Sequence, residues 1–307
     1  MDICDKLPQK PERPLDSDCC GQGCDPCVLD IYEQELDIWH QECHRLTTGQ
    51  TCEPRESSLE LPAGPVLHPA EYRPFTVVKI EKETECCKRY TFSLPHGETL
   101  GLRPGQHVIM SATINGETVT RQYTPVSDIE QKSSFELLIK VYDKGKMSQY
   151  VRTWSVGTEI QLRGPCGNFI YKSNQYKMML MVAVGTGITP MAQLIQAILN
   201  NKDDETLIQL HYGCRTYRDI LLKARLDEWS QYWNLSCTYY LSQEAVCDNK
   251  TYRYRDSVVQ GRMNSTRITS VMNPQSSDYL VLVCGTKNFE TDMLKHLKVT
   301  RDKVHKF

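Results

Sequence analysis

An arginine and a tyrosine alternate as Arg121 and Tyr123 within RQYTPVS, the stretch that covers residues 121–127. On an extended backbone, side chains two residues apart point to the same face, so the guanidinium and the phenol ring would lie side by side. A guanidinium binds a phosphate through two parallel hydrogen bonds, and an aromatic ring can stack on a flat heterocycle. The pair therefore suits a nucleotide-bearing flavin, although an Arg–Tyr pair on a strand is also an ordinary surface feature.

A short predicted helix follows the next strand-like run and starts at a glycine. The segment Gly145-Lys146-Met147-Ser148 opens this helix, and Val151 lies near its end. A helix start led by glycine exposes free backbone N–H groups and the positive end of the helix dipole, which together bind phosphate. The alternative interpretation is a simple turn into a surface helix.

A glycine-rich turn between a strand and a helix occupies residues 185–191, with the sequence GTGITPM. The apolar run 178–184 directly precedes it and suits a buried parallel strand. We expect Thr189 to cap the following helix and Pro190 to occupy its first position. Strand, glycine turn and capped helix predict a pyrophosphate site, although Pro190 replaces the third glycine of the full G-x-G-x-x-G pattern.

Four cysteines lie within nine residues of the N-terminal region, namely Cys19, Cys20, Cys24 and Cys27. Four sulfurs can hold zinc or an iron–sulfur centre. Neighbouring side chains point apart, so the fourth ligand could instead come from the His- and Cys-containing residues 40–44. Residues 28–39 predict a short amphipathic helix. The alternative interpretation is a peptide of reduced thiols that docks on a partner through this helix.

The elements that would position the first two motifs form a predicted all-β domain over residues 67–174. Short alternating runs cover residues 75–81, 90–94, 107–114, 117–123, 135–142 and 159–163. Turn signals separate these runs, and strands at this spacing predict a small antiparallel barrel. We expect residues 164–169, with the sequence GPCGNF, to form a turn open to close backbone approach or a tight hairpin.

Residues 175–307 predict an α/β domain that positions the glycine turn. Predicted strands cover residues 178–184, 207–212, 236–241 and 279–284, and they alternate with predicted helices after 189, at 219–229 and at 289–297. This alternation predicts a parallel sheet with ligands at the carboxyl ends of its strands. Residues 1–66 remain as a small Cys-rich extension and a Pro-rich linker.

Length and composition exclude several classes of function. A chain of 307 residues suits two domains and an appendage. A net charge of −2 and a pI near 6.5 give no bulk nucleic-acid or membrane-surface character. The longest apolar run, 178–184, is far shorter than the roughly 20 residues of a spanning helix, and no secretory signal precedes the cysteines. We therefore expect a soluble intracellular monomer with reduced thiols, cytoplasmic or alternatively mitochondrial.

The order of the motifs resembles the NADH–cytochrome b5 reductase family of ferredoxin-reductase-like flavoproteins. The motifs that carry the resemblance are R-x-Y-T-P-x-S at 121–127, K-V-Y at 140–142, G-K-M-S at 145–148, G-T-G-I-T-P-M at 185–191 and C-G at 284–285. With the N-terminal CCGQGCDPC segment, the whole chain resembles the cytochrome b5 reductase-like members of that family. The resemblance implies an FAD-binding antiparallel β-barrel followed by a Rossmann-like NAD domain.

The implied activity is an FAD-dependent NAD(P)H reductase that passes electrons singly to a haem protein such as cytochrome b5. The resemblance places Thr189, Lys140 and Cys284 beside the reacting rings. It assigns cofactor binding to Arg121, Tyr123, Thr124, Pro125, Val126, Ser127, Ile139, Lys140, Val141, Tyr142, Gly145, Lys146, Met147, Ser148, Gly185, Thr186, Gly187, Thr189, Pro190, Cys284, Gly285 and Phe307. Zinc or an iron–sulfur centre on the N-terminal cysteines is a separate hypothesis.

The chain departs from the family pattern at three places. The family's glycine before G-T-G is Val184 here. The family motif C-G-P-P continues here as Thr286 and Lys287, without the prolines. The acidic residue that follows the third α/β strand in the family is replaced by Ser242, with Glu244 nearby as another ribose ligand. We therefore expect NADH and NADPH to be used with similar efficiency. A competing hypothesis is a reductase-fold binding module that presents its Cys-rich N-terminus to a partner.

Overall fold

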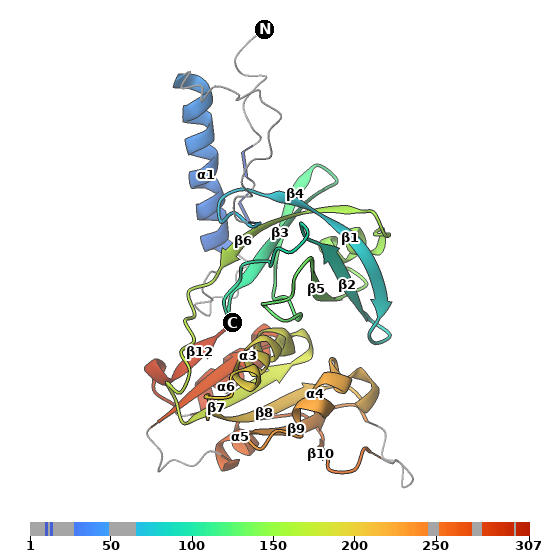
Figure 1. Cartoon of the computed structure of the whole chain (residues 1–307), viewed down its shortest axis with the longest axis vertical. Helices are drawn as coiled ribbons and strands as arrows, with labels where there is room; N and C mark the ends of the chain where they lie inside the picture. Colours follow the sequence, from blue (N-terminus) through green and yellow to red (C-terminus); the bar gives the residue numbers. More distant parts are fainter. Residues whose placement is uncertain are drawn as a thin grey trace.

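Two six-stranded sheets organise the described part of the chain. The computed structural model describes residues 10–11, 13–14, 28–48, 66–244, 252–271, 278–297 and 299–307. Figure 1 shows the first sheet above the second, with the long helix α1 (Val28–Thr48) beside the first. The proposed metal ligands Cys19, Cys20, Cys24 and Cys27 lie outside the described residues. None of the helices in the described part combines the length and apolarity that a bilayer-spanning segment needs.

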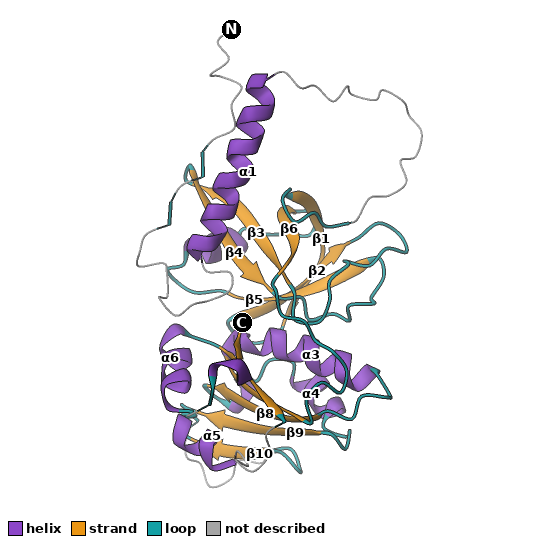
Figure 2. Ribbon diagram, turned by 90° about the vertical axis from the view of Figure 1, so that its left-hand side faces the viewer, coloured by secondary structure: helices purple, strands orange, loops and turns teal. Residues whose placement is uncertain are grey.

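The first sheet is antiparallel and curls around one apolar core (Figure 2). Its strands, in the order β4-β3-β6-β1-β2-β5, are β1 (Arg73–Lys82), β2 (Cys87–Ser93), β3 (His107–Ile114), β4 (Glu117–Tyr123), β5 (Ser134–Lys140) and β6 (Glu159–Cys166). Alternate side chains point inward, and Phe92 stacks on Phe135 with ring centroids 5.0 Å apart. The helix α2 (Lys146–Arg152) follows β5.

The prediction of a turn or hairpin at residues 164–169 was wrong. Strand β6 continues to Cys166, which pairs with His107 of β3. The backbone N–H of Gly164 donates to the carbonyl of His68 at 3.0 Å. The segment before β1 therefore supplies the hydrogen-bond acceptor for this part of the strand. The register between β3 and β6 shifts at residues 107–109, which accommodates the Gly-Pro step.

The second sheet is parallel and carries helices on both faces. Its strands, in the order β10-β9-β8-β7-β11-β12, are β7 (Met178–Val184), β8 (Leu207–Cys214), β9 (Leu235–Leu241), β10 (Ser257–Gln260), β11 (Tyr279–Cys284) and β12 (Val304–Lys306). Side chains on one face of the sheet pack with helices α3 (Ile188–Asn200) and α4 (Lys223–Trp229). Side chains on the opposite face pack with α5 (Ser265–Val271) and α6 (Lys287–His296).

Several elements of this second half differ from the sequence-based prediction. The elements β10, α5 and β12 are absent from the sequence-based prediction, because they are short and carry no clear period. Helix α4 begins at Lys223, not at Asp219. The Asp219 carboxylate caps the preceding 3₁₀ turn η3 (Tyr217–Asp219) together with Thr216, and Leu222 has a left-handed backbone with φ 57°.

Helix α1 extends beyond the predicted residues 28–39 and is anchored on the first sheet near its start. Ile31 is buried, and the Tyr72 hydroxyl donates to Glu35 Oε1 at 2.6 Å. The guanidinium of Arg163, a buried residue of β6, lies 5.5 Å from the Tyr72 ring. The helix of the N-terminal region therefore contacts the segment that precedes β1, and Arg163 of β6 lies on the other side of Tyr72.

Candidate functional site

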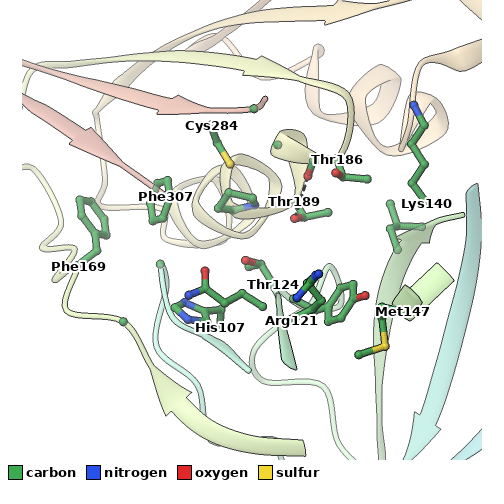
Figure 3. Close-up of a pocket in the computed structure, with 18 of the residues that line it drawn as sticks. His107, Arg121, Thr124, Lys140, Met147, Phe169, Thr186, Thr189, Cys284 and Phe307 are labelled. Carbon is green, nitrogen blue, oxygen red and sulfur yellow. Dashed lines mark hydrogen bonds between the residues drawn. The ribbon is translucent and has the colours of Figure 1, made fainter. Parts of the chain in front are cut away.

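A cavity of about 390 Å³ lies between the two sheets and is lined by residues of both. Sixteen of the residues predicted to bind or act on cofactors line it, namely Arg121, Tyr123, Thr124, Lys140, Tyr142, Gly145, Lys146, Met147, Ser148, Thr186, Gly187, Thr189, Pro190, Cys284, Gly285 and Phe307. In Figure 3, Cys284, Thr186 and Thr189 stand across the cavity from Arg121 and Thr124. Residues from five separate stretches of sequence, 121–124, 140–148, 186–190, 284–285 and 307, therefore converge on one space.

The other predicted residues lie behind the cavity wall; they are Pro125, Val126, Ser127, Ile139, Val141 and Gly185. Val126 and Ile139 are buried in the apolar cores. The Ser127 hydroxyl accepts the N–H of Glu136 at 3.1 Å, which fixes the end of the R-x-Y-T-P-x-S segment on β5. The Gly185 carbonyl accepts the hydroxyl of Tyr212 at 2.9 Å. These residues shape the wall and do not line it.

On the first sheet, β4 presents Arg121 and Tyr123 to the cavity, two residues apart. The exposed Arg121 guanidinium donates to the carbonyl of Thr120 at 2.7 Å and keeps further N–H groups for a phosphate. Burial raises the pKa of Tyr123 to about 12, so its phenol is neutral at physiological pH. A flat neutral ring beside a cation matches the predicted flavin nucleotide surface.

The start of α2 forms the next part of this wall. The Ser148 hydroxyl accepts the N–H of Tyr142 at 3.0 Å, so its own proton remains available to an acceptor in the cavity. A Cβ on Gly145 would lie 3.1 Å from Ser148 Oγ, which is tighter than ordinary contact. Lys146 pairs with Glu117, and the Lys140 ammonium lies 5.6 Å from the ring centroid of Tyr142.

The wall from the second sheet lies where the strand order reverses. The chain leaves β7 toward β8, β9 and β10 and later returns to β11 on the other side of β7. In such sheets the crevice at the carboxyl ends of the two diverging strands binds ligands. Here the 3₁₀ turn η2 (Gly185–Gly187) follows β7, and Cys284 ends β11.

The two turns at this crevice are in close contact. A Cβ on Gly187 would lie 2.2 Å from the carbonyl oxygen of Cys284. A Cβ on Gly285 would lie 2.3 Å from a methyl carbon of Val184. Real Cβ atoms do not approach so closely, so this crevice requires glycine at both positions. Backbone at these two glycines therefore forms part of the cavity surface, beside the side chains of Thr189 and Cys284.

The predicted helix cap at Thr189 was wrong. Helix α3 begins at Ile188 directly after η2, and Gly187 occupies the cap position. The Thr189 hydroxyl donates back to the carbonyl of Thr186 at 3.1 Å, and Pro190 is the third helical residue instead of the first. The glycine turn is itself helical, so it joins α3 without a separate cap. Thr189 nevertheless lines the cavity.

Eight lining residues were not among the predicted site residues, namely Gly105, His107, Gln122, Leu138, Gly167, Asn168, Phe169 and His305. The ring of Phe169 packs on Gly105, where a Cβ would lie 2.4 Å from Phe169 Cδ1. Phe169, His305 and Phe307 form an aromatic group, with the two phenylalanine centroids 5.3 Å apart. The alternation of His305 with Phe307 in the last residues was the available signal.

Polar side chains fix the second domain against the first. The buried Gln193 of α3 accepts the N–H of Gly105 at 2.7 Å and donates to the carbonyl of Gln106 at 3.2 Å. Arg225 of α4 in the second domain donates to Glu136 Oε2 of β5 in the first domain at 2.6 Å. Gln193 lies one turn after Thr189 on α3. The two hydrogen bonds of Gln193 therefore also fix the position of Thr189 relative to the first sheet.

The carboxyl ends of β8 and β9 carry the residues considered for nucleotide choice. The Ser242 hydroxyl donates to the carbonyl of Cys214 at 3.2 Å. The Glu244 carboxylate accepts the N–H of Tyr217, the first residue of η3, at 2.6 Å. The acidic side chain at this edge is therefore that of Glu244. The Ser242 side chain is hydrogen-bonded to the backbone of β8 instead.

The residues present fit a flavin and a nicotinamide nucleotide. A guanidinium, a hydroxyl proton and backbone N–H groups at a helix start supply donors for phosphates. The rings of Tyr123 and Tyr142 and the backbone crevice supply flat surfaces. Among the described residues, no cluster of three or more His, Cys, Asp or Glu side chains could hold a metal ion.

Comparison with known families agrees with this division of the site. Residues 74–171 match the family described as "Oxidoreductase FAD-binding domain" and residues 181–295 match "Oxidoreductase NAD-binding domain". Residues 5–48 match "Oxidoreductase-like protein, N-terminal". The expectation of FAD and NAD(H) as the cofactor classes is thereby supported, and the predicted two-part fold is confirmed.

Individual relatives give the same result. A mouse protein named "NADH-cytochrome b5 reductase-like" is 37% identical over 293 residues, which cover 94% of this chain and 91% of that protein. "NADH-cytochrome b5 reductase 1" of Dictyostelium discoideum is 39% identical over 76% of this chain and 79% of its own. The solved cytochrome b5 reductase domain of Ulva prolifera nitrate reductase superposes with a TM-score of 0.70 and 25% identity, covering 80% of this chain and all of that domain.

Proposed function

The chain belongs to the NADH–cytochrome b5 reductase family, and from that premise we propose that it is an FAD-dependent NAD(P)H reductase. The observation that carries this proposal is the shared cavity. Arg121 and Tyr123 line it from the first sheet, and Thr189 and Cys284 line it from the second. A nicotinamide held by the second wall would therefore meet a flavin held by the first.

When bound, FAD accepts two electrons together from a reduced nicotinamide and returns them singly to an acceptor. The chain supplies binding and orientation for this exchange. We propose that Arg121 and the start of α2, with Ser148, hold the FAD phosphates, and that Tyr123 supports the flavin ring. Both contacts come from elements of the first core, so the ring is held on a rigid surface.

We propose that Thr189, Lys140 and Cys284 contact the reacting rings. The Thr189 hydroxyl donates to Thr186, which leaves its oxygen as an acceptor facing the cavity. Lys140 brings a cation to the same space from β5. Phe307 and Phe169 cover the other end of the cavity and limit the access of water. Such positioning lowers the barrier by fixing the donor and acceptor atoms at close approach.

For the electron donor we propose NADH, with NADPH used less well. The sequence-based expectation was similar use of both nucleotides. The Glu244 carboxylate, held by the Tyr217 N–H, carries a negative charge at the strand ends where the adenosine ribose of dinucleotides binds in such sheets. This charge would accept a ribose hydroxyl and repel a 2′-phosphate.

For the electron acceptor we propose a haem protein such as cytochrome b5, because the relatives carry that acceptor in their names. The test is NADH oxidation by FAD-saturated protein, with ferricyanide and then cytochrome b5 as acceptors. Activity with both acceptors supports the full proposal. Activity with ferricyanide alone would exclude cytochrome b5 as the electron acceptor. Absence of NADH oxidation with either acceptor would overturn the reductase assignment.

A further inference from the structure

A buried ion pair lies directly behind the cavity wall of the second sheet. It joins Glu290 of α6 to Lys306 of β12, with 3.5 Å between Lys306 Nζ and Glu290 Oε2. Each side chain is only 7% exposed. Taking two charges out of water is expensive, and a well-packed apolar pair of similar volume is often equally or more stable. Stability alone therefore gives little reason for charges at this place.

The second oxygen of Glu290 holds the turn that follows β11. The backbone N–H of Gly285 donates to Glu290 Oε1 at 2.9 Å. Gly285 and Cys284 both line the cavity. The next two residues, Thr286 and Lys287, are not prolines, so no ring restricts the backbone after this glycine. The conformation of the turn therefore depends on contacts such as the one with Glu290.

Lys306 connects the same carboxylate to the last strand. Successive residues of a strand point to opposite faces, and His305 and Phe307 line the cavity while Lys306 points to α6. The N–H of Phe307 also donates to the carbonyl of Val283 at 3.1 Å. One carboxylate thus contacts both segments that supply Cys284 and Phe307 to the cavity.

We propose that Glu290 is a positioning residue, which fixes the Cys284–Gly285 turn and the Phe307 strand as one unit for the nicotinamide. This inference rests on the proposed reductase function. Glu290 lies behind the wall and touches no cofactor site itself. Its effect passes through the Gly285 amide and through Lys306, so the variants can separate these two contacts from each other.

The test uses the full chain with FAD and three variants. The double substitution Glu290→Leu with Lys306→Met removes the acceptor for Gly285 and replaces the charges by an apolar pair. Glu290→Gln keeps an acceptor for Gly285 but removes the carboxylate charge opposite Lys306. Asp292→Ala is the control, because Asp292 lies on the same helix in an exposed pair with His296, at 3.7 Å.

Three quantities are measured for each variant. They are the melting temperature, the hydrogen exchange of the Gly285 amide in the cofactor-free protein, and the anaerobic rate of flavin reduction by NADH. Reduction by dithionite serves as the reference, since it does not need the nicotinamide wall. We expect the double variant to melt near the wild-type temperature, with Gly285 exchange and NADH reduction each changed at least tenfold. We expect Glu290→Gln to melt lower, with Gly285 exchange within about threefold of wild type and NADH reduction lowered less than in the double variant, because only the link to Lys306 is weakened.

Flavin reduction that follows the melting temperature across these variants would show a purely structural role and overturn the inference. Unchanged Gly285 exchange in the double variant would do the same. Failure of wild-type protein to accept electrons from NADH would instead count against the proposed function. The exchange measurement still decides the role of Glu290 in that case, because it needs neither cofactor.

Discussion

The two walls of the cavity are built by different means. The wall from the first sheet presents side chains, with Arg121 and Tyr123 two residues apart on β4 and Ser148 at the start of α2. In the wall from the second sheet, the backbone at Gly187 and Gly285 lies beside the side chains of Thr189 and Cys284, and neither glycine has room for a Cβ unless its neighbours move. The first wall should therefore be sensitive to the loss of side-chain atoms, and the second to their addition.

The largest expected effect comes from adding one methyl group to the wall from the second sheet. In Gly187→Ala the new Cβ would meet the Cys284 carbonyl at 2.2 Å, so one of the two turns must move. We expect flavin reduction by NADH to fall at least a hundredfold while FAD stays bound, measured by anaerobic stopped-flow absorbance.

Gly185→Ala is the matched comparison for this effect. Gly185 has a φ of +56° with nothing within 4 Å of a new Cβ, so the added cost is backbone strain of about 1–2 kcal/mol. We expect a lower melting temperature and a loss of reduction rate well below that of Gly187→Ala. Equal losses in the two variants would mean that the close contact between the turns is unimportant.

Removing a side chain tests the other wall. Arg121→Ala removes a charged hydrogen-bond donor worth about 1.5–3 kcal/mol, which weakens FAD binding roughly 10- to 100-fold. The measurement is the dissociation constant for FAD from fluorescence quenching. Lys79→Ala, at an exposed pair with Glu81 on the same sheet, should leave it unchanged. Retention of wild-type affinity in Arg121→Ala would place the FAD phosphates elsewhere.

The same contrast explains what the sequence could predict. Side chains at alternate strand positions have a period, so Arg121 and Tyr123 could be expected on one surface from the sequence, and both line the cavity. The glycine turn after β7 was also identified, but the helical start at Ile188 displaced Thr189 from its expected cap. Glu290 and Gln193 could not be found, since both act on backbone groups brought near only by the fold.

A smaller effect is expected at the strand ends of the second sheet. Glu244→Gln keeps a hydrogen-bond acceptor but removes the negative charge beside the proposed ribose site. We expect NADPH efficiency to rise about tenfold relative to NADH, or about 1.4 kcal/mol. Ser242→Ala is the control, because the Ser242 hydroxyl donates to the Cys214 carbonyl. An unchanged nucleotide ratio in Glu244→Gln would place the ribose away from Glu244.

The smallest effect on the cavity is expected from the N-terminal cysteines. Replacement of Cys24 and Cys27 by serine should leave FAD content and NADH–ferricyanide activity unchanged, since the residues proposed to hold the two cofactors all lie between 121 and 307. Elemental analysis of wild type and variant tests the separate prediction of zinc or an iron–sulfur centre. A metal content near one ion or cluster per chain in the wild type, lost in the variant, supports a metal site. Metal-free wild-type protein would favour the alternative, a peptide of reduced thiols that docks on a partner.

Anaerobic titration of the FAD-reconstituted protein with NADH, followed by visible absorption, tests the central claim most directly. That claim is that one cavity brings a flavin on the wall from the first sheet to a nicotinamide on the wall from the second sheet. We predict a protein-bound flavin band that bleaches with about one equivalent of NADH. Failure to bind flavin, or a bound flavin that NADH leaves oxidised while dithionite reduces it, would contradict the account.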